Sequence, residues 1–121
     1  MQDIRDLNKA IDLLKSRSDL CLRIQPIRPE RLGWGVITDA SFANASQGKS
    51  QGAYAVVAYD VEVLERGEGR CNLLHRRSGK IQRVANSTLA AETQSMSRGL
   101  GELSWTVTVF NELTTLGFDL K

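Results

Sequence analysis

The chain has 121 residues, of which 41% are hydrophobic and 25% charged, and its formal net charge at pH 7 is +2. This size and composition are those of one globular domain, and they exclude a wholly disordered or collagen-like chain. No apolar run approaches the roughly 18 residues of a membrane span, and no segment has the order of a secretory signal, so we expect no membrane partner.

The first 30 residues predict a helix, a short strand and a linker. Apolar residues recur at spacings of three and four within residues 3–16, which indicates one face of an amphipathic helix. Apolar residues then occupy every second position of residues 20–24, which predicts a short strand. Pro26 and Pro29 interrupt this pattern, so we expect a linker over residues 25–31.

Three β-prone segments follow, at residues 34–38, 52–59 and 71–75. Their connections are too short for crossover helices, so the three strands should form a consecutive antiparallel meander. Small, polar or glycine-rich segments predict loops or turns at residues 40–50, 65–69 and 78–80.

The last segment carries the longest helical pattern. Residues spaced three or four apart from Leu89 to Leu113 are apolar except for Thr93. This pattern predicts a long helix that packs its apolar stripe against the core. Ser87 or Thr88 is the expected N-cap. The predicted fold class is α/β with an α+β-like portion: a three-stranded antiparallel meander with a long helix packed on one face.

Glycines and aromatic residues add detail to this helix and its core. Gly99 and Gly101 cost about 1 kcal/mol each relative to alanine, and we expect them to permit close packing on the sheet. Gly117 stands where a C-cap glycine belongs. The aromatic side chains expected in the core are Trp34, Tyr54, Trp105 and Phe110.

The cysteine content bears on the cellular compartment. Cys21 and Cys71 lie far apart and no secretory signal precedes them, which predicts reduced thiols and an intracellular, cytoplasmic or nuclear protein. One histidine and two distant cysteines cannot form a four-ligand zinc site.

Two acidic residues are candidates for metal chemistry. Asp39 ends the first predicted strand, where it either starts a turn or serves as a ligand. Glu92 lies on or beside the apolar stripe, where it is either exposed near the helix N-terminus or paired, protonated or metal-bound. If the start of the helix crosses the first strand, the two carboxylates converge. Such a pair suits Mg²⁺ or Mn²⁺ and in-line phosphodiester cleavage.

The order of the motifs resembles a known family. Residues 35–43 (GVITDASFA), 52–57 (GAYAVV) and 87–96 (STLAAETQSM) are similar to the ribonuclease H domain of copia-type retrotransposon Pol polyproteins. Residues 6–15 (DLNKAIDLLK) resemble the helix at the end of the reverse transcriptase part. The resemblance implies that residues 1–30 are a helix and short strand of the polymerase connection or linker, and residues 31–121 the N-terminal part of a ribonuclease H-like domain.

The resemblance also implies an activity. Asp39 matches the first catalytic aspartate of the family and Glu92 its helix glutamate, both as ligands of Mg²⁺ or Mn²⁺. The implied enzyme is an endonuclease that hydrolyses the RNA strand of RNA–DNA hybrids. The family places further acidic ligands after the long helix, beginning in a fourth strand, whereas the sequence ends at Lys121. We therefore expect an incomplete metal site and little or no activity of this chain by itself, with the remainder of the polyprotein as a partner.

A second hypothesis is a non-catalytic, domesticated remnant that binds nucleic acid or a protein partner through the same fold. Asp39 and Glu92 would then be relics or structural residues. An open sheet edge and an uncovered helix surface would in either case favour self-association.

A basic stretch follows the second strand. Residues 66–83 hold six Lys and Arg side chains against the single acid Glu68. They form either a solvated hairpin or a surface that contacts phosphates without reading sequence. The candidate nucleic-acid-binding residues are Arg66, Arg70, Arg76, Arg77, Lys80 and Arg83. His75 lies among them with no catalytic partner beside it in the sequence.

Overall fold

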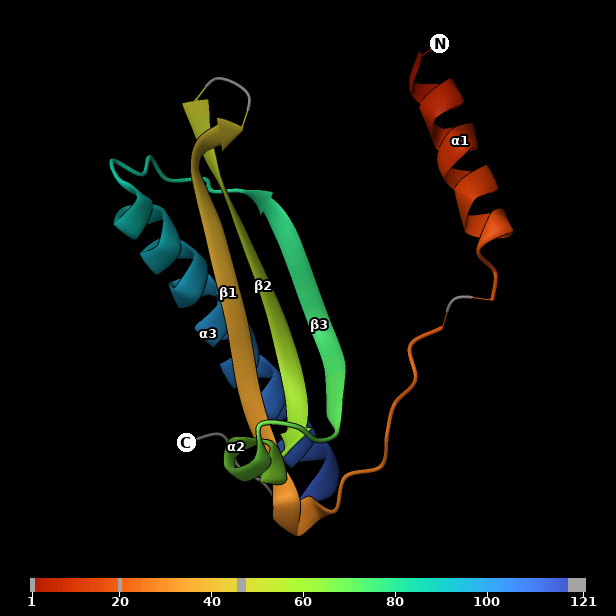
Figure 1. Ribbon diagram of the computed structural model, residues 1–121, viewed down its shortest axis with the longest axis vertical. Helices are drawn as coiled ribbons and strands as arrows, with labels where there is room; N and C mark the ends of the chain where they lie inside the picture. The colour runs from red at the N-terminus through yellow and green to blue at the C-terminus, as the bar shows by residue number, and fades with distance from the viewer. Residues whose placement is uncertain (1, 20, 46–47, 118–121) are drawn as a thin grey trace.

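The protein, described here by a computed structural model over residues 2–19, 21–45 and 48–117, is a mixed α+β fold (Figure 1). A sheet of three antiparallel strands in the order β1-β2-β3 is covered on one face by a long helix, as predicted. The elements are α1 (Gln2–Ser16), a 3₁₀ helix (Pro29–Arg31), β1 (Leu32–Ala45), β2 (Lys49–Asp60), α2 (Glu62–Arg66), β3 (Cys71–Lys80) and α3 (Thr88–Thr114).

The strands are longer than the sequence suggested. The expected loop over residues 40–50 is wrong, because β1 continues to Ala45 and β2 begins at Lys49. The register shifts between Ser41 and Ala45, where Ala43 takes a positive φ of 56°. The expected turn at residues 78–80 is also wrong, because β3 runs to Lys80. Small polar residues continue these ladders because the pairing is made by the backbone.

Two connections also differ from the prediction. The short strand expected over residues 20–24 is wrong for residues 21–24, which have no regular structure, and Leu20 lies outside the described residues. The linker is held instead by Asn72, which imitates a peptide group. The Gln25 N–H donates to Asn72 Oδ1 at 2.8 Å and Asn72 Nδ2 donates to the Gln25 carbonyl at 2.9 Å. Helix α2 was not predicted; it ends at Arg66 and is capped by Gly67, which has a φ of 74°.

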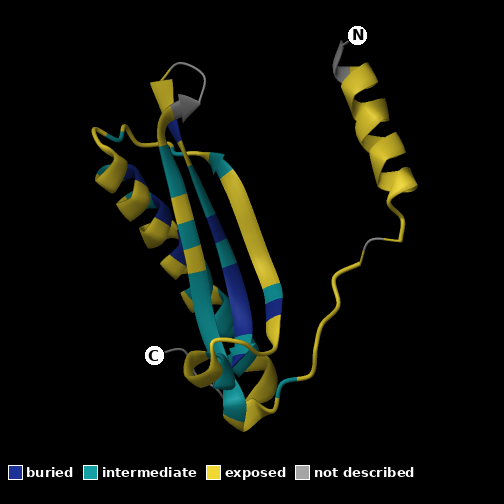
Figure 2. Cartoon of the chain, viewed as in Figure 1, coloured by how far each residue is buried: buried dark blue, intermediate teal, exposed yellow. Residues whose placement is uncertain are grey.

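Helix α1 forms as predicted, and its side chains from residue 4 onward are exposed (Figure 2). It stands apart from the sheet, joined to it by the extended linker (Figure 1).

Helix α3 approaches the sheet through small residues. Its buried residues are Ala91, Ser95 and Gly99. A Cβ on Gly99 would lie 2.9 Å from Cγ2 of both Thr38 and Val36, so this glycine permits close packing as expected. Gly101, in contrast, has no neighbour within 4 Å of a Cβ position, so the same expectation for it was wrong.

The predicted apolar stripe of α3 is only partly buried: Leu103, Val107 and Phe110 are half-buried, whereas the remaining apolar positions are exposed. Leu89 is 72% exposed and Leu113 80% exposed, and Met96 and Leu100 are also exposed (Figure 2). The reason is steric, because the closest approach selects the face without large side chains.

The aromatic residues divide between the core and the surface. Phe110 packs edge-to-face on Trp34 with ring centroids 4.9 Å apart, and Tyr54 is buried, as expected. Trp105 is 66% exposed, so its expected place in the core was wrong. The C-terminal end of α3 is capped by Thr115 rather than by Gly117, which takes a positive φ two residues later.

An ionic cluster fixes the start of β1 to the end of β2. Arg31 Nε donates to Asp60 Oδ1 at 2.9 Å, and Arg31 Nη2 donates to Glu62 Oε2 at 2.7 Å. The Glu62 N–H also donates to Asp60 Oδ1 at 3.1 Å. This backbone N–H and then the Arg31 guanidinium hold the pKa of Asp60 below its ordinary value of 3.8.

This lowered pKa predicts a pH dependence of stability. Because the pKa of Asp60 is lower in the folded state, its contribution is present above pH 3.8 and is lost as the pH falls through the lowered value. We expect the stability difference between wild type and Asp60→Asn, measured by urea unfolding, to shrink in that acidic range. Glu65→Gln, at an exposed acid of α2, is the control. A difference that stays constant down to the acid limit would contradict the assignment.

Candidate functional site

Asp39 lies on the face of the sheet opposite to α3. Its neighbour Thr38 contacts α3 at Gly99, and adjacent strand residues point to opposite faces. Asp39 pairs across the ladder with Ala53 of β2. Its side chain borders a hollow of about 490 Å³ on the open sheet face. Other residues that line this hollow are Ile37, Ala53, Ala55, Arg76 and Ser78.

Glu92 lies near the start of α3 on an exposed position. The helix begins as predicted at the N-cap Ser87, whose hydroxyl accepts a hydrogen bond from the Ala90 N–H at 3.1 Å. One turn after Glu92, the buried Ser95 Oγ donates to the carbonyl oxygens of Asp39 at 2.9 Å and Ala53 at 2.8 Å. The helix therefore crosses the sheet at Asp39 within one turn of Glu92.

The structure does not bring the two carboxylates onto one face of the sheet, because α3, which bears Glu92, packs on the face opposite to the Asp39 side chain. The N-terminal part of α3 extends past the edge strand β1 (Figure 1), while the Asp39 side chain lies on the open sheet face. Within the part of the chain that the structure describes, neither carboxylate has a hydrogen-bond or ion-pair partner. Two exposed, unpaired carboxylates suit Mg²⁺, which takes one or two protein carboxylates together with waters and phosphate oxygens. No group of three or more potential metal ligands occurs among the described residues.

The six basic residues predicted to contact nucleic acid do not form one surface. Arg66 pairs with Glu62 at 2.7 Å, and Arg70 donates to the Pro26 carbonyl at 2.8 Å, both near the start of β3. Arg76 and Arg77 are consecutive strand residues, so they point to opposite faces. Arg76 borders the hollow beside Asp39.

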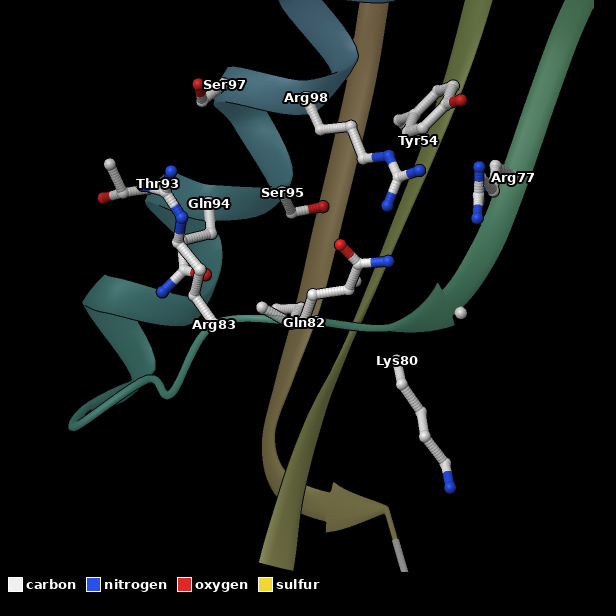
Figure 3. A pocket seen from close by; sticks show the side chains of 13 residues that line it. Tyr54, Arg77, Lys80, Gln82, Arg83, Thr93, Gln94, Ser95, Ser97 and Arg98 are labelled. Carbon is white, nitrogen blue, oxygen red and sulfur yellow. The ribbon is translucent and has the colours of Figure 1, made fainter.

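The remaining basic residues line a cleft between α3 and β3. Arg77 and Lys80 come from β3, and Arg83 comes from the segment that follows it. Arg98 of α3 joins them, although it lies outside the basic stretch (Figure 3). Sequence reasoning missed Arg98 because its approach to Arg77 depends on how the helix crosses the sheet. The cleft has a volume of about 450 Å³, and Gly52 of β2 contributes to its lining.

His75 is engaged with the helix rather than with the acidic site. Its Nδ1 lies 3.8 Å from Glu102 Oε2, and its ring packs edge-to-face on Tyr54 at 5.5 Å. Burial, and then the charge of Glu102, raise the pKa of Tyr54. The Tyr54 hydroxyl is buried without a hydrogen-bond partner among the described residues. This arrangement indicates a packing role for His75.

No protein-family model, curated protein or solved structure matches this chain. Among the described residues, no helix has the length and hydrophobicity required to cross a bilayer.

Proposed function

We propose that this chain belongs to a ribonuclease H-like nuclease of a copia-type retroelement, which hydrolyses the RNA strand of RNA–DNA hybrids. In this proposal Asp39 and Glu92 hold Mg²⁺ or Mn²⁺. The observation that carries the proposal is the contact of Ser95 with the Asp39 carbonyl, because it aligns the turn that bears Glu92 with the strand position of Asp39.

The surroundings of Asp39 suit a phosphodiester backbone. Ala53 and Ala55 keep the hollow beside Asp39 open, and Arg76 supplies a positive charge at its border. A bound Mg²⁺ would activate a water and neutralise charge on the phosphate. The two carboxylates would position that ion at the free edge of β1, while Arg76 would contact the phosphates that flank the cleaved bond.

The proposal predicts the effect of removing either acid in the absence of metal. If both carboxylates face the phosphates, they repel the hybrid in EDTA, and Asp39→Asn or Glu92→Gln should raise its affinity. The expected gain is up to about fivefold, from the ~1 kcal/mol between unit charges 4 Å apart in water. Fluorescence anisotropy of a labelled RNA–DNA hybrid at low salt measures it. Added Mg²⁺ should improve binding by wild type more than by either variant.

The control is Glu112→Gln, at an exposed acid near the other end of α3, which should leave the affinity unchanged. Cleavage of the hybrid in Mg²⁺ that is lost in both Asp39→Asn and Glu92→Gln would support the proposal directly. Hybrid binding that neither substitution alters, or an absence of hybrid binding at low salt, would overturn it.

A second candidate function is non-catalytic binding of nucleic acid or of a protein. The observation that favours it is the basic cleft, which lies on the helix face of the sheet and contains no acid among its lining residues. The exposed apolar side chains of α3 also favour a protein partner, including a second copy of the chain. Hybrid binding that is independent of both Asp39 and Glu92 is the result that this function predicts.

A further inference from the structure

The cleft between α3 and β3 concentrates positive charge. Its lining residues include the basic residues Arg77, Lys80, Arg83 and Arg98 and no acid, although the Lys80 side chain extends away from Arg77 and Arg98 (Figure 3). Arg98 from the helix and Arg77 from the strand extend toward each other across it (Figure 3). A cleft lined by one sign of charge focuses the electric field and attracts the opposite charge.

The three arginines of this cleft are not compensated within the described chain. Arg77, Arg83 and Arg98 form no ion pair or hydrogen bond there, whereas Arg31 and Arg66 both pair with acids. Guanidinium groups that converge in a concave site repel one another until an anion lies between them. The arrangement therefore favours an anionic ligand.

The shape of the cleft indicates the size of that ligand. A volume of about 450 Å³ exceeds the need of a single phosphate and lies within the range of small-ligand pockets. Gly52 and Gly79 leave part of the lining without side chains. Neutral side chains that can donate hydrogen bonds, Gln82, Thr93, Gln94 and Ser97, complete it.

We propose that this cleft binds the sugar–phosphate backbone of a nucleic-acid strand without a metal ion. Arginine suits the role because its planar fork can contact two phosphate oxygens at once. Contacts to phosphate oxygens carry no sequence information, so we expect binding that is independent of sequence. The choice of a nucleic-acid strand as the anionic ligand rests on the proposed function. Binding in the cleft itself does not depend on Asp39 or Glu92.

The test is hybrid binding in EDTA, measured by anisotropy between about 50 and 200 mM salt. Each phosphate contact contributes about 0.9 to the slope of log affinity against log salt. Losing one contact should therefore weaken binding about eightfold at 0.1 M salt. The double variant Arg77→Gln/Arg98→Gln should therefore bind about sixtyfold more weakly there, with a slope smaller by about 1.8.

The matched control is Arg5→Gln/Arg17→Gln, which removes the same charge from exposed positions of α1 and its C-terminal flank. Equal losses in the two double variants would overturn the inference, because net charge alone would explain them. Arg98→Glu provides a second test, because reversing the charge should weaken binding more than removing it in Arg98→Gln. Equal affinities of these two variants would also count against the cleft. Circular dichroism of each variant establishes that it is folded.

The results separate this inference from the proposed function. If the cleft variants lose binding while Asp39→Asn and Glu92→Gln leave it unchanged, the cleft is supported and the nuclease site is not. If only the acid variants alter binding, the nuclease site is supported and the cleft proposal fails.

Discussion

Gly99→Val is expected to destabilise the protein by about 3 kcal/mol, because it inserts a branched side chain where α3 meets β1. The first added carbon alone would lie 2.9 Å from the Cγ2 atoms of Val36 and Thr38. Both neighbours are β-branched strand residues with little rotamer freedom, so the helix must move away from the sheet. Urea unfolding followed by circular dichroism measures the change.

Gly101 provides the control within the same helix. No atom lies within 4 Å of its Cβ position, so Gly101→Ala should stabilise the protein by about 1 kcal/mol through helix propensity. Gly99→Ala gains the same propensity but meets the contacts of Val36 and Thr38, so it should be less stable than Gly101→Ala. If both alanine substitutions stabilise the protein equally, the close approach of α3 to β1 at Gly99 is wrong.

The order of the main elements could be predicted because it depends on local signals. β-prone runs with short connections led to the antiparallel meander, and the N-cap at Ser87 was identified from its side-chain chemistry. The ends of the strands could not be predicted in this way. Residues 40–45 and 78–80 look like loops by composition, but strand β2 pairs with them through the backbone.

The orientation of α3 shows a limit of hydrophobic periodicity. The pattern from Leu89 to Leu113 predicted a helix correctly, but in the first half of the helix it pointed to an exposed face. Ala91, Ser95 and Gly99 form the closer contact because their small side chains let the backbones approach. Size complementarity across two elements is not encoded in the periodicity of one of them.

The candidate site was predictable where it depends on a motif and unpredictable where it depends on how elements cross. Asp39 and Glu92 were selected from local sequence, and the helix does cross the sheet beside Asp39. The separation of Arg76 from Arg77 follows from strand alternation and could have been foreseen. The contribution of Arg98 to the cleft could not, because it requires the path of α3 across the sheet.

Ser95→Ala is expected to destabilise the protein by about 1 to 3 kcal/mol, the cost of leaving buried polar groups without a partner. The Ser95 hydroxyl is buried between two strands and contacts the carbonyl oxygens of Asp39 and Ala53. Alanine removes both contacts without adding volume. Ser104→Ala, at an exposed position of α3 outside the cleft, should change the free energy of unfolding by less than about 0.5 kcal/mol.

The same substitution tests whether Ser95 aligns the two acids. If this hydroxyl holds the turn of Glu92 against the strand position of Asp39, its loss should weaken the Mg²⁺-dependent part of hybrid binding even where the chain remains folded. The increase in hybrid affinity on adding Mg²⁺, measured by anisotropy for Ser95→Ala and Ser104→Ala, decides this point. An unchanged Mg²⁺ response in Ser95→Ala would mean that the Ser95 contact stabilises the fold without positioning the acids. The alignment of α3 with β1 would then come from the rest of the interface between the helix and the sheet.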